Sequence, residues 1–314
     1  MIDFRYHIVS IVAIFFALGA GVLLGAGPLK NTGANVVQDQ ADRDRAALGQ
    51  AREDLIQAKA LDKYRDDYVQ KVTSVLVAGK LKDRKVALVT MPQADGQMID
   101  DLTNEIQQAG GQVTTRVSLS TKLFDTEQQQ LVDSLMNQLV TSDITFAQNS
   151  TTFERAGQIL ARAIADTQEG KPVDDDATRI MSGLTGSKLF GVKPTPKDRA
   201  SLIVFVSGKQ PAESADETTY TDAVDLAQGL RNGSAGVVVA GTPETSQDGA
   251  LLTVLRSDSD ATKKVSSVDV ANLPSGQATV VFALLEQAEG GAGQYGGMDA
   301  KDGVAPKSEL VQQN

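Results

Sequence analysis

The sequence predicts an α/β protein with three successive parts: an N-terminal transmembrane helix, a long coiled-coil helix, and a Rossmann-like or flavodoxin-like domain with a mostly parallel sheet. Three observations predict this order. The chain of 314 residues opens with an uncharged apolar run and continues with a charged segment whose apolar residues have helical spacing. Short apolar runs then alternate with amphipathic segments, as is typical of parallel strands covered by helices on both faces.

The apolar run over residues 8–29 predicts a membrane helix that is retained. It holds about 22 residues without a charge, whereas roughly 20 are needed to cross a bilayer and a signal peptide core has only about 7 to 15. Residues 1–7 are expected to form a short cytoplasmic tail that carries Arg5. The rest of the chain is then expected outside the cytoplasm, although basic residues on the two sides are nearly balanced in number.

Small residues recur at every fourth position of this run, which places them on one stripe of a helix. Such a stripe lets two membrane helices approach closely, but Ala and Gly are also common in membrane helices in general. The stripe consists of Ala13, Ala17, Gly21 and Gly25.

Residues 36–78 are predicted to form a coiled-coil stalk about 65 Å long, at about 1.5 Å per residue. Apolar residues recur there about every 3.4 positions, close to the 3.5 of a coiled coil. A parallel homodimer is expected, because the membrane stripe and the seam would then pair with the same partner. The alternative is a helix that packs on its own domain. The predicted seam consists of Leu48, Ala51, Leu55, Ala58, Leu61, Tyr64, Tyr68, Val72 and Val75.

Residues 82–289 are predicted to form the α/β domain. Its expected strands lie in the apolar segments 85–92, 110–119, 201–208, 235–242 and 264–270, and its expected helices at 97–108, 126–140, 153–167, 220–231, 246–255 and 276–287. Ligands of such sheets bind outside the carboxyl ends of the strands. Those ends carry residues 91–92, 207–209 and 241–243, with no glycine fingerprint or Walker sequence to specify a ligand.

Three other segments are interpreted structurally. The glycine-rich stretch 182–191 is expected to be a flexible connector, and Asp174 to Asp176 are expected to cap the helix that follows. Residues 290–314 are predicted to be a flexible Gly-rich tail. Within it, Tyr295 is flanked by glycines and is expected to dock into a groove of its own domain or of a partner.

Composition excludes several classes of function. The net charge of −10 argues against nucleic acid binding, which needs a basic surface. The chain has no cysteine, so disulfides and thiolate metal sites are excluded. Its one histidine is His7, at the edge of the apolar run, so a Ser-His-Asp triad in the domain is excluded too. We therefore expect a protein that is not an enzyme and has no cofactor or metal site.

The opening segment, the stalk, the stretch AGGQVTTRVSL and the closing GGAGQYGG together resemble the actinobacterial MctB/SteB family of envelope proteins, over nearly the whole chain. The most specific matches are the amino-terminal segment and the residues Gly293, Gln294, Tyr295 and Gly296. The resemblance implies two functions. Mycobacterial members imply copper transport or homeostasis, as an efflux or channel component. Corynebacterial members, which look closer, imply a cell-division adaptor that couples a SteA-like membrane protein to control of septal peptidoglycan hydrolysis.

Residue chemistry favours the adaptor at this point. Copper(I) prefers thiolate and thioether ligands, whereas this chain has no cysteine and its methionines are scattered at 91, 98, 136, 181 and 298. Strands that alternate with helices also do not match a transmembrane barrel. We therefore expect a non-enzymatic, membrane-anchored dimeric adaptor of cell division, with copper transport as the alternative and a small-ligand-binding domain as the second alternative. Copper itself is implied by the resemblance alone.

Overall fold

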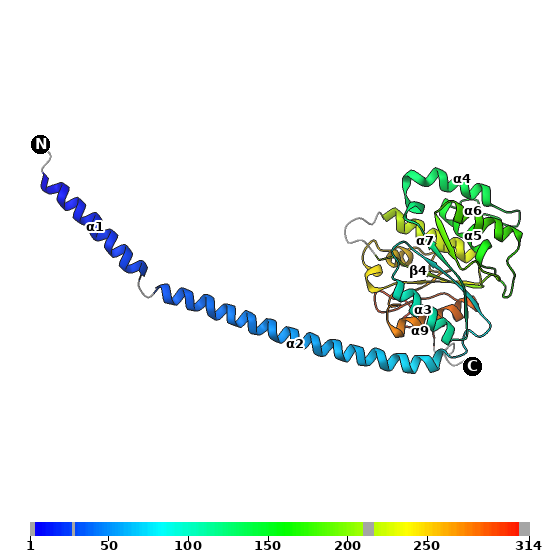
Figure 1. Cartoon of the computed structure of the whole chain (residues 1–314), viewed down its shortest axis with the longest axis horizontal. Coiled ribbons are helices and arrows are strands. Elements are labelled where there is room, and N and C mark those ends of the chain that lie inside the picture. The colour runs from blue at the N-terminus through cyan, green and yellow to red at the C-terminus, as the bar shows by residue number, and fades with distance from the viewer. Residues whose placement is uncertain (1–3, 27–28, 210–216, 308–314) are drawn as a thin grey trace. The chain divides into compact units, whose positions relative to one another are not determined.

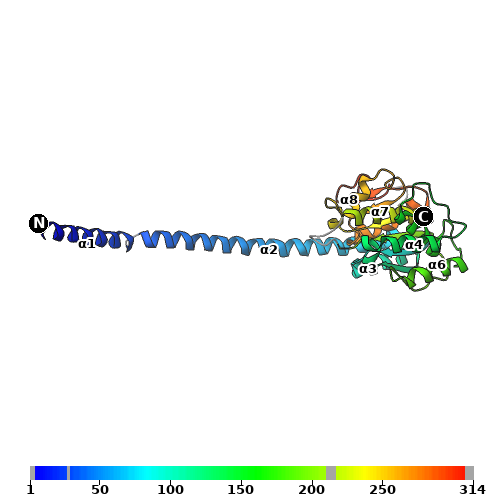
Figure 2. The same cartoon turned by 90° about the horizontal axis from the view of Figure 1, so that it is seen from above.

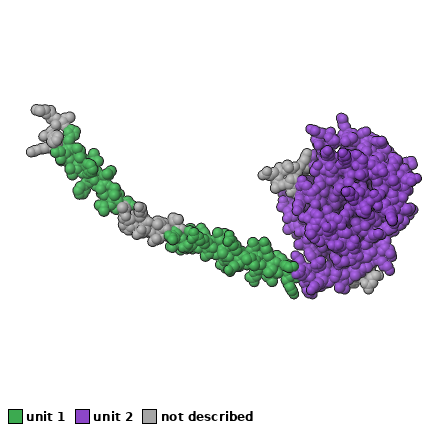
Figure 3. Space-filling model, in the orientation of Figure 1, with its two compact units in different colours: residues 1–65 green, residues 66–314 purple. Residues whose placement is uncertain are grey.

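The computed structural model describes residues 4–26, 29–209 and 217–307, and it divides into two compact units, residues 1–65 and 66–314 (Figure 3). The predicted α/β fold is confirmed: an apolar helix and a long helix precede a mostly parallel sheet with helices (Figure 1).

The first unit contains helix α1, Phe4–Ala26, and most of helix α2, Leu29–Val77. The segment Tyr6–Gly25 of α1 is long and apolar enough to cross a membrane, and its large side chains are exposed. Helix α2 has 49 residues and carries ion pairs between side chains three positions apart, such as Arg45 with Asp42. Such pairs each stabilise a helix by a few tenths of a kcal/mol (about 0.2–0.5).

Among the described residues, the second unit is built on a seven-stranded sheet with the order β3-β2-β1-β4-β5-β6-β7. The strands are β1 Lys85–Thr90, β2 Gln112–Leu119, β3 Phe190–Lys193, β4 Leu202–Val206, β5 Gly236–Ala240, β6 Ser266–Val268 and β7 Gln294–Tyr295. All neighbours pair in parallel except β2 and β3, which are antiparallel. The five predicted strands are confirmed, and β3 and β7 are added at the two edges.

Helices cover both faces of the sheet, and the central strands are therefore buried on both sides. Helices α3 (Gly96–Gln108) and α9 (Pro274–Ala288) pack on one face, together with Val77 at the end of α2. The other face carries α4 (Gln129–Leu139), α5 (Thr152–Ile164), α6 (Asp175–Gly186), α7 (Glu217–Asn232) and α8 (Leu251–Ser257), a layer seen from above in Figure 2. The short 3-10 helices are η1 Thr121–Phe124, η2 Thr126–Gln128 and η3 Pro243–Ser246.

The prediction of a flexible connector over residues 182–191 is wrong. This stretch is the end of α6 and the beginning of β3. Two of its three glycines allow close packing, because a Cβ on Gly183 would meet the side chain of Leu139 and one on Gly191 would meet the hydroxyl of Ser118. The prediction for the acidic stretch before it is confirmed: Asp174 caps α6 by accepting a hydrogen bond of 2.8 Å from the backbone of Ala177.

The prediction of a flexible tail is wrong for residues 290–307; residues 308–314 lie outside the described part. Strand β7 extends the sheet, with Gly293 O accepting from Ser267 N and Tyr295 O accepting from Asp269 N. Composition suggested flexibility because few apolar groups are available there. The segment is instead held by buried polar groups of the domain, which composition does not reveal.

Candidate functional site

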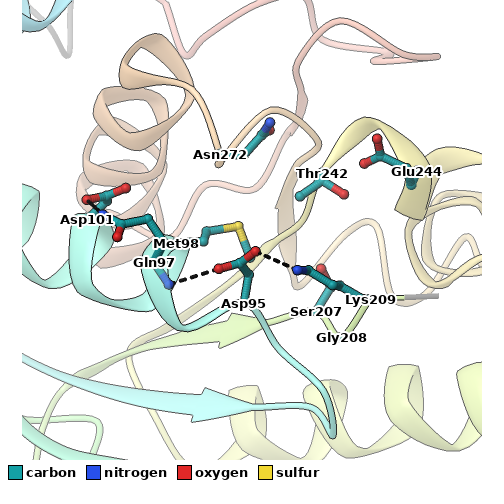
Figure 4. Close-up of a pocket in the computed structure, with 10 residues that line it drawn as sticks. All are labelled: Asp95, Gln97, Met98, Asp101, Ser207, Gly208, Lys209, Thr242, Glu244 and Asn272. Atoms are coloured by element: carbon teal, nitrogen blue, oxygen red, sulfur yellow. Dashed lines mark hydrogen bonds and ion pairs between the residues drawn. The ribbon is translucent and has the colours of Figure 1, made fainter. Parts of the chain in front are cut away.

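A cleft of about 440 Å³ opens at the carboxyl ends of the central strands (Figure 4). Its walls come from the segments that follow β1, β4, β5 and β6. The sheet order reverses between β1 and β4, and parallel sheets bind their ligands in the crevice at such a switch point. The lining residues are Asp95, Gln97, Met98, Asp101, Ser207, Gly208, Lys209, Thr242, Glu244 and Asn272.

Close contact between two loops shapes one end of the cleft. After β4 the chain reaches Gly208, which forms an isolated antiparallel bridge with Ala94 of the loop that follows β1. A Cβ on Gly208 would overlap the carbonyl oxygen of Pro92, so only glycine allows this approach. The approach brings Lys209 beside Asp95.

An ion pair and the start of a helix meet at this end. Asp95 caps helix α3 by accepting a hydrogen bond of 2.9 Å from the backbone of Gln97, and its other oxygen lies 2.9 Å from Lys209 Nζ. The hydrogen bond from Lys209, followed by that from Gln97, lowers the pKa of Asp95. Asp95 is therefore ionised at neutral pH.

Two further carboxylates line the cleft. Asp101 accepts a hydrogen bond of 2.8 Å from the Gln97 side-chain amide. A hydrogen bond from Thr242 lowers the pKa of Glu244, so this carboxyl group is also charged at neutral pH. Because Lys209 is the one basic residue among the ten lining residues, the cleft carries excess negative charge.

Ser207, directly after β4, is 2% exposed, and its hydroxyl has no hydrogen-bond partner within the described residues. Buried hydroxyl groups are almost always hydrogen-bonded in folded proteins. Ser207 is one of the residues that line the cleft, so a molecule bound there would be placed to supply the missing hydrogen bond. Sequence analysis identified this strand end as a ligand position but not the role of the hydroxyl.

The cleft does not have the ligand set of a tight copper(I) site. Met98 contributes the one thioether among the lining residues, and the remaining side chains offer oxygen and nitrogen atoms. In the described part of the chain, no group of three or more His, Cys, Asp or Glu residues is arranged to hold a metal ion. Since copper(I) prefers several soft ligands, the arrangement suits binding by hydrogen bonds and charge.

The motif residues 293–296 hold β7 against the domain. Gln294 accepts a hydrogen bond of 2.6 Å from Ser267 and donates one of 2.9 Å to Val265 O, while the Tyr295 hydroxyl donates at 2.7 Å to Glu286. A Cβ on Gly293 would overlap the Tyr295 ring. One on Gly296, whose φ is +134°, would overlap the carboxylate of Asp269. Tyr295 therefore docks within its own domain.

Arg256 and Asp269 form a buried ion pair of 2.8 Å beneath this motif, which sequence analysis missed. Asp269 also accepts from the backbone of Gly297 and Met298, and Arg256 donates to Tyr295 O and Met298 O. The signal in the sequence was an acidic residue directly after an apolar strand. However, no residue near Asp269 in the sequence indicated that its ion-pair partner would be Arg256 of α8.

The structure leaves the predicted seam of α2 exposed. Val69, Thr73 and Val77 form the face of α2 that turns toward the α/β domain, whereas the seam positions Val72 and Val75 lie on the exposed side. The last turns of α2 therefore do not use the seam for packing within the chain. In α1, a Cβ on Gly21 or Gly25 would have no neighbour within 4 Å. Pairing of the stripe and the seam with a second copy stays a prediction.

Comparison with known proteins gives a consistent result over nearly the whole chain. The family model described as "Copper transport outer membrane protein, MctB" matches residues 1–306. The chain is similar to proteins named "Copper transporter MctB" from Mycobacterium tuberculosis and Mycobacterium bovis, with 27% identity over 94% of this chain and 96% of theirs. The protein of the same name from Mycobacterium leprae is 23% identical, with the same coverage.

Proposed function

This chain belongs to the MctB family of copper transport outer membrane proteins, and we propose that it serves copper transport or homeostasis as a membrane-anchored envelope protein. The supporting observation is the extent of the family match, which covers residues 1–306 and so includes both helices and the α/β domain. The names of the mycobacterial relatives favour copper over the cell-division adaptor that residue chemistry alone had favoured.

We propose that α1 anchors the chain in a membrane with its N-terminus in the cytoplasm and the α/β domain outside. Support for anchoring comes from the uncharged span Tyr6–Gly25. Support for the orientation comes from Arg5 on the short side and from the tendency of long domains to be translocated regardless of their charge.

We further propose that the chain works as a homodimer, paired through the seam of α2 and the small-residue stripe of α1. Exposure of the seam in the single chain supports this pairing, because the apolar side chains of Leu48, Leu55 and Leu61 are otherwise in contact with water. A polar cleft with one thioether does not retain copper(I) tightly. Copper is the cargo in this proposal, and it would therefore be bound and passed on by the dimer and its partners rather than held tightly within one α/β domain.

The test is cellular copper content after deletion of the gene in the organism that carries it. We expect the deletion strain to accumulate copper and to grow poorly in added copper, and we expect the full chain to restore both. A Leu55→Asp chain should restore them less well than an Ile56→Asp chain, since only Leu55 lies on the seam.

A different phenotype of the deletion strain would contradict the copper function. That phenotype is unchanged copper content together with elongated or chained cells. It would instead support the adaptor, with its SteA-like membrane partner and its peptidoglycan hydrolase system. Those two partners stay predictions from the family resemblance.

A further inference from the structure

The cleft at the switch point contains a polar group that the described residues leave without a hydrogen bond. Ser207 lines the cleft, and its hydroxyl is buried and has no hydrogen-bond partner within the described residues. The cleft volume of about 440 Å³ is within the range of small-molecule pockets, about 300–1,000 Å³. A bound molecule that hydrogen-bonds to Ser207 would satisfy this buried hydroxyl group.

The position that normally binds an anion in such a cleft, the N-terminus of the first helix of the domain, is already occupied by a carboxylate of the chain. Phosphates in folds of this kind bind at the N-terminus of the helix after the first strand. Here the carboxylate of Asp95 occupies that position at α3 and also pairs with Lys209. A phosphate or carboxylate ligand would have to displace Asp95 from both contacts, which argues against an anionic ligand.

The remaining charges favour a cation. Asp101 and Glu244 lie on opposite sides of the cleft in Figure 4, and the basic residue that lines the cleft, Lys209, is paired with Asp95. Because a carboxylate offers about four lone-pair sites, Asp101 keeps acceptor capacity beyond its bond from Gln97. Each of the two carboxylates can therefore receive an ammonium group.

The neutral lining residues indicate the rest of the ligand. Ser207, Thr242 and Asn272 present hydroxyl and amide groups, which suit hydroxyl groups on a small molecule. None of the ten lining residues is aromatic, so the cleft offers no ring for a nucleobase to stack on, and a nucleobase ligand is disfavoured. A bare metal ion is also disfavoured, since the described residues contain no cluster of three metal-binding side chains.

We propose that this cleft binds a small hydroxylated amine of monosaccharide size, with its ammonium group on Asp101 or Glu244 and its hydroxyl groups on Ser207 and Asn272. This site goes beyond the copper function and does not depend on it. Binding of such a molecule would give the α/β domain a ligand of its own, distinct from the cargo of the family.

The test is calorimetric titration of the full chain in detergent with three probes that share one ring and differ in charge: glucosamine, glucose and glucose 6-phosphate. We expect glucosamine to bind most tightly, glucose more weakly and glucose 6-phosphate not measurably. The double variant Asp101→Asn, Glu244→Gln should lose the preference for glucosamine over glucose. We expect this preference to be about tenfold, or about 1.4 kcal/mol, because hydrogen bonds to charged groups are stronger than those between neutral groups. The two single variants identify which carboxylate holds the ammonium group.

Two controls separate the contributions. Ser207→Ala should weaken glucosamine and glucose equally, because the hydroxyl contact does not depend on ligand charge. Glu127→Gln removes an exposed carboxylate outside the cleft and should change nothing. Tighter binding of glucose 6-phosphate than of glucosamine, or no binding of glucosamine at millimolar concentrations, would overturn the proposal. Either result would leave the copper phenotype of the deletion strain unaffected.

Discussion

Buried polar side chains of this domain differ in how completely they are bonded. Arg256 and Asp269 are 5% and 0% exposed, and each makes several hydrogen bonds besides their ion pair. Ser207 is equally buried but unbonded within the described residues. The first case is typical of a structural contact and the second of a position reserved for a ligand or water.

Arg256→Ala should destabilise the domain strongly. The substitution leaves the carboxylate of Asp269 buried without its cation, and breaking a buried pair in this way costs about 3–5 kcal/mol. Urea unfolding followed by circular dichroism measures the change. Arg116→Ala is the matched control, because its ion pair with Asp100 is exposed and such pairs contribute about 0–1 kcal/mol. Equal losses for the two variants would contradict a structural role of the buried pair.

Glu105 is a buried carboxyl group whose Oε1 has no partner within the described residues, and burial raises its pKa above the ordinary value of 4.5. A raised pKa means that the folded state holds this proton more tightly than the unfolded state. Folding therefore becomes less favourable as pH rises from about 4.5 through the raised pKa. At neutral pH this carboxyl group therefore lowers the stability of the folded state.

Glu105→Gln should consequently be more stable than the wild type at neutral pH, with a difference that shrinks as pH falls toward 4.5. Unfolding midpoints across this pH range measure the effect. Asp248→Asn, in an exposed loop, should show no such trend. A constant difference at every pH would mean that packing, rather than ionisation, is responsible.

At the scale of elements, α2 has two faces with different surroundings. Its last turns bury Thr73 and Val77 against the domain, while Leu55 and its seam neighbours are exposed along the helix. A helix with an exposed apolar row at heptad spacing is expected to pair with a second helix.

Leu55→Asp should therefore reduce self-association of the full chain in detergent. A charge at a seam position would be buried between the two α2 helices of a dimer, which is unfavourable. We therefore expect a shift from dimer to monomer in sedimentation equilibrium. Ile56→Asp is the control, because it introduces the same charge at the neighbouring residue, which is 69% exposed and does not belong to the seam. If both variants remain dimeric, the seam prediction fails. If both become monomeric, the seam has been assigned to the wrong face.

At the scale of the whole molecule, a family named for copper transport contains a chain without cysteine and with dispersed methionines. Met98 lines the cleft, whereas Met136 and Met181 are buried on the other face of the sheet. Such a distribution does not provide several soft ligands at one place in the domain.

Copper(I) titration of the full chain, with its mass recorded in the same sample, should therefore reveal no tight stoichiometric site. Weak binding through isolated thioether groups is expected instead. Tight binding at a fixed ratio would contradict this, and would mean that methionines from two copies meet in the dimer. Met98→Leu and Met298→Leu would then identify which of them is a ligand.

Local sequence patterns were sufficient for much of the architecture. The apolar run over 8–29, the charged helix after it and the five central strands were all predicted, because apolar periodicity is a property of neighbouring residues. Two errors share one cause. Residues 182–191 and 290–307 are rich in glycine and look flexible in the sequence, but glycines such as Gly191 and Gly296 are there because another group lies too close for a Cβ.

The sequence alone thus determined the class of fold, the candidate membrane helix, the positions of the central strands and the strand ends at which a ligand would bind. Only the tertiary structure decided what those ends contain. It brought Lys209 to Asp95 and joined Arg256 to Asp269 beneath the motif residues 293–296. It also left the Ser207 hydroxyl without a hydrogen-bond partner among the residues that the structure describes. Such contacts join residues far apart in the chain and depend on the strand order, which no local pattern specifies.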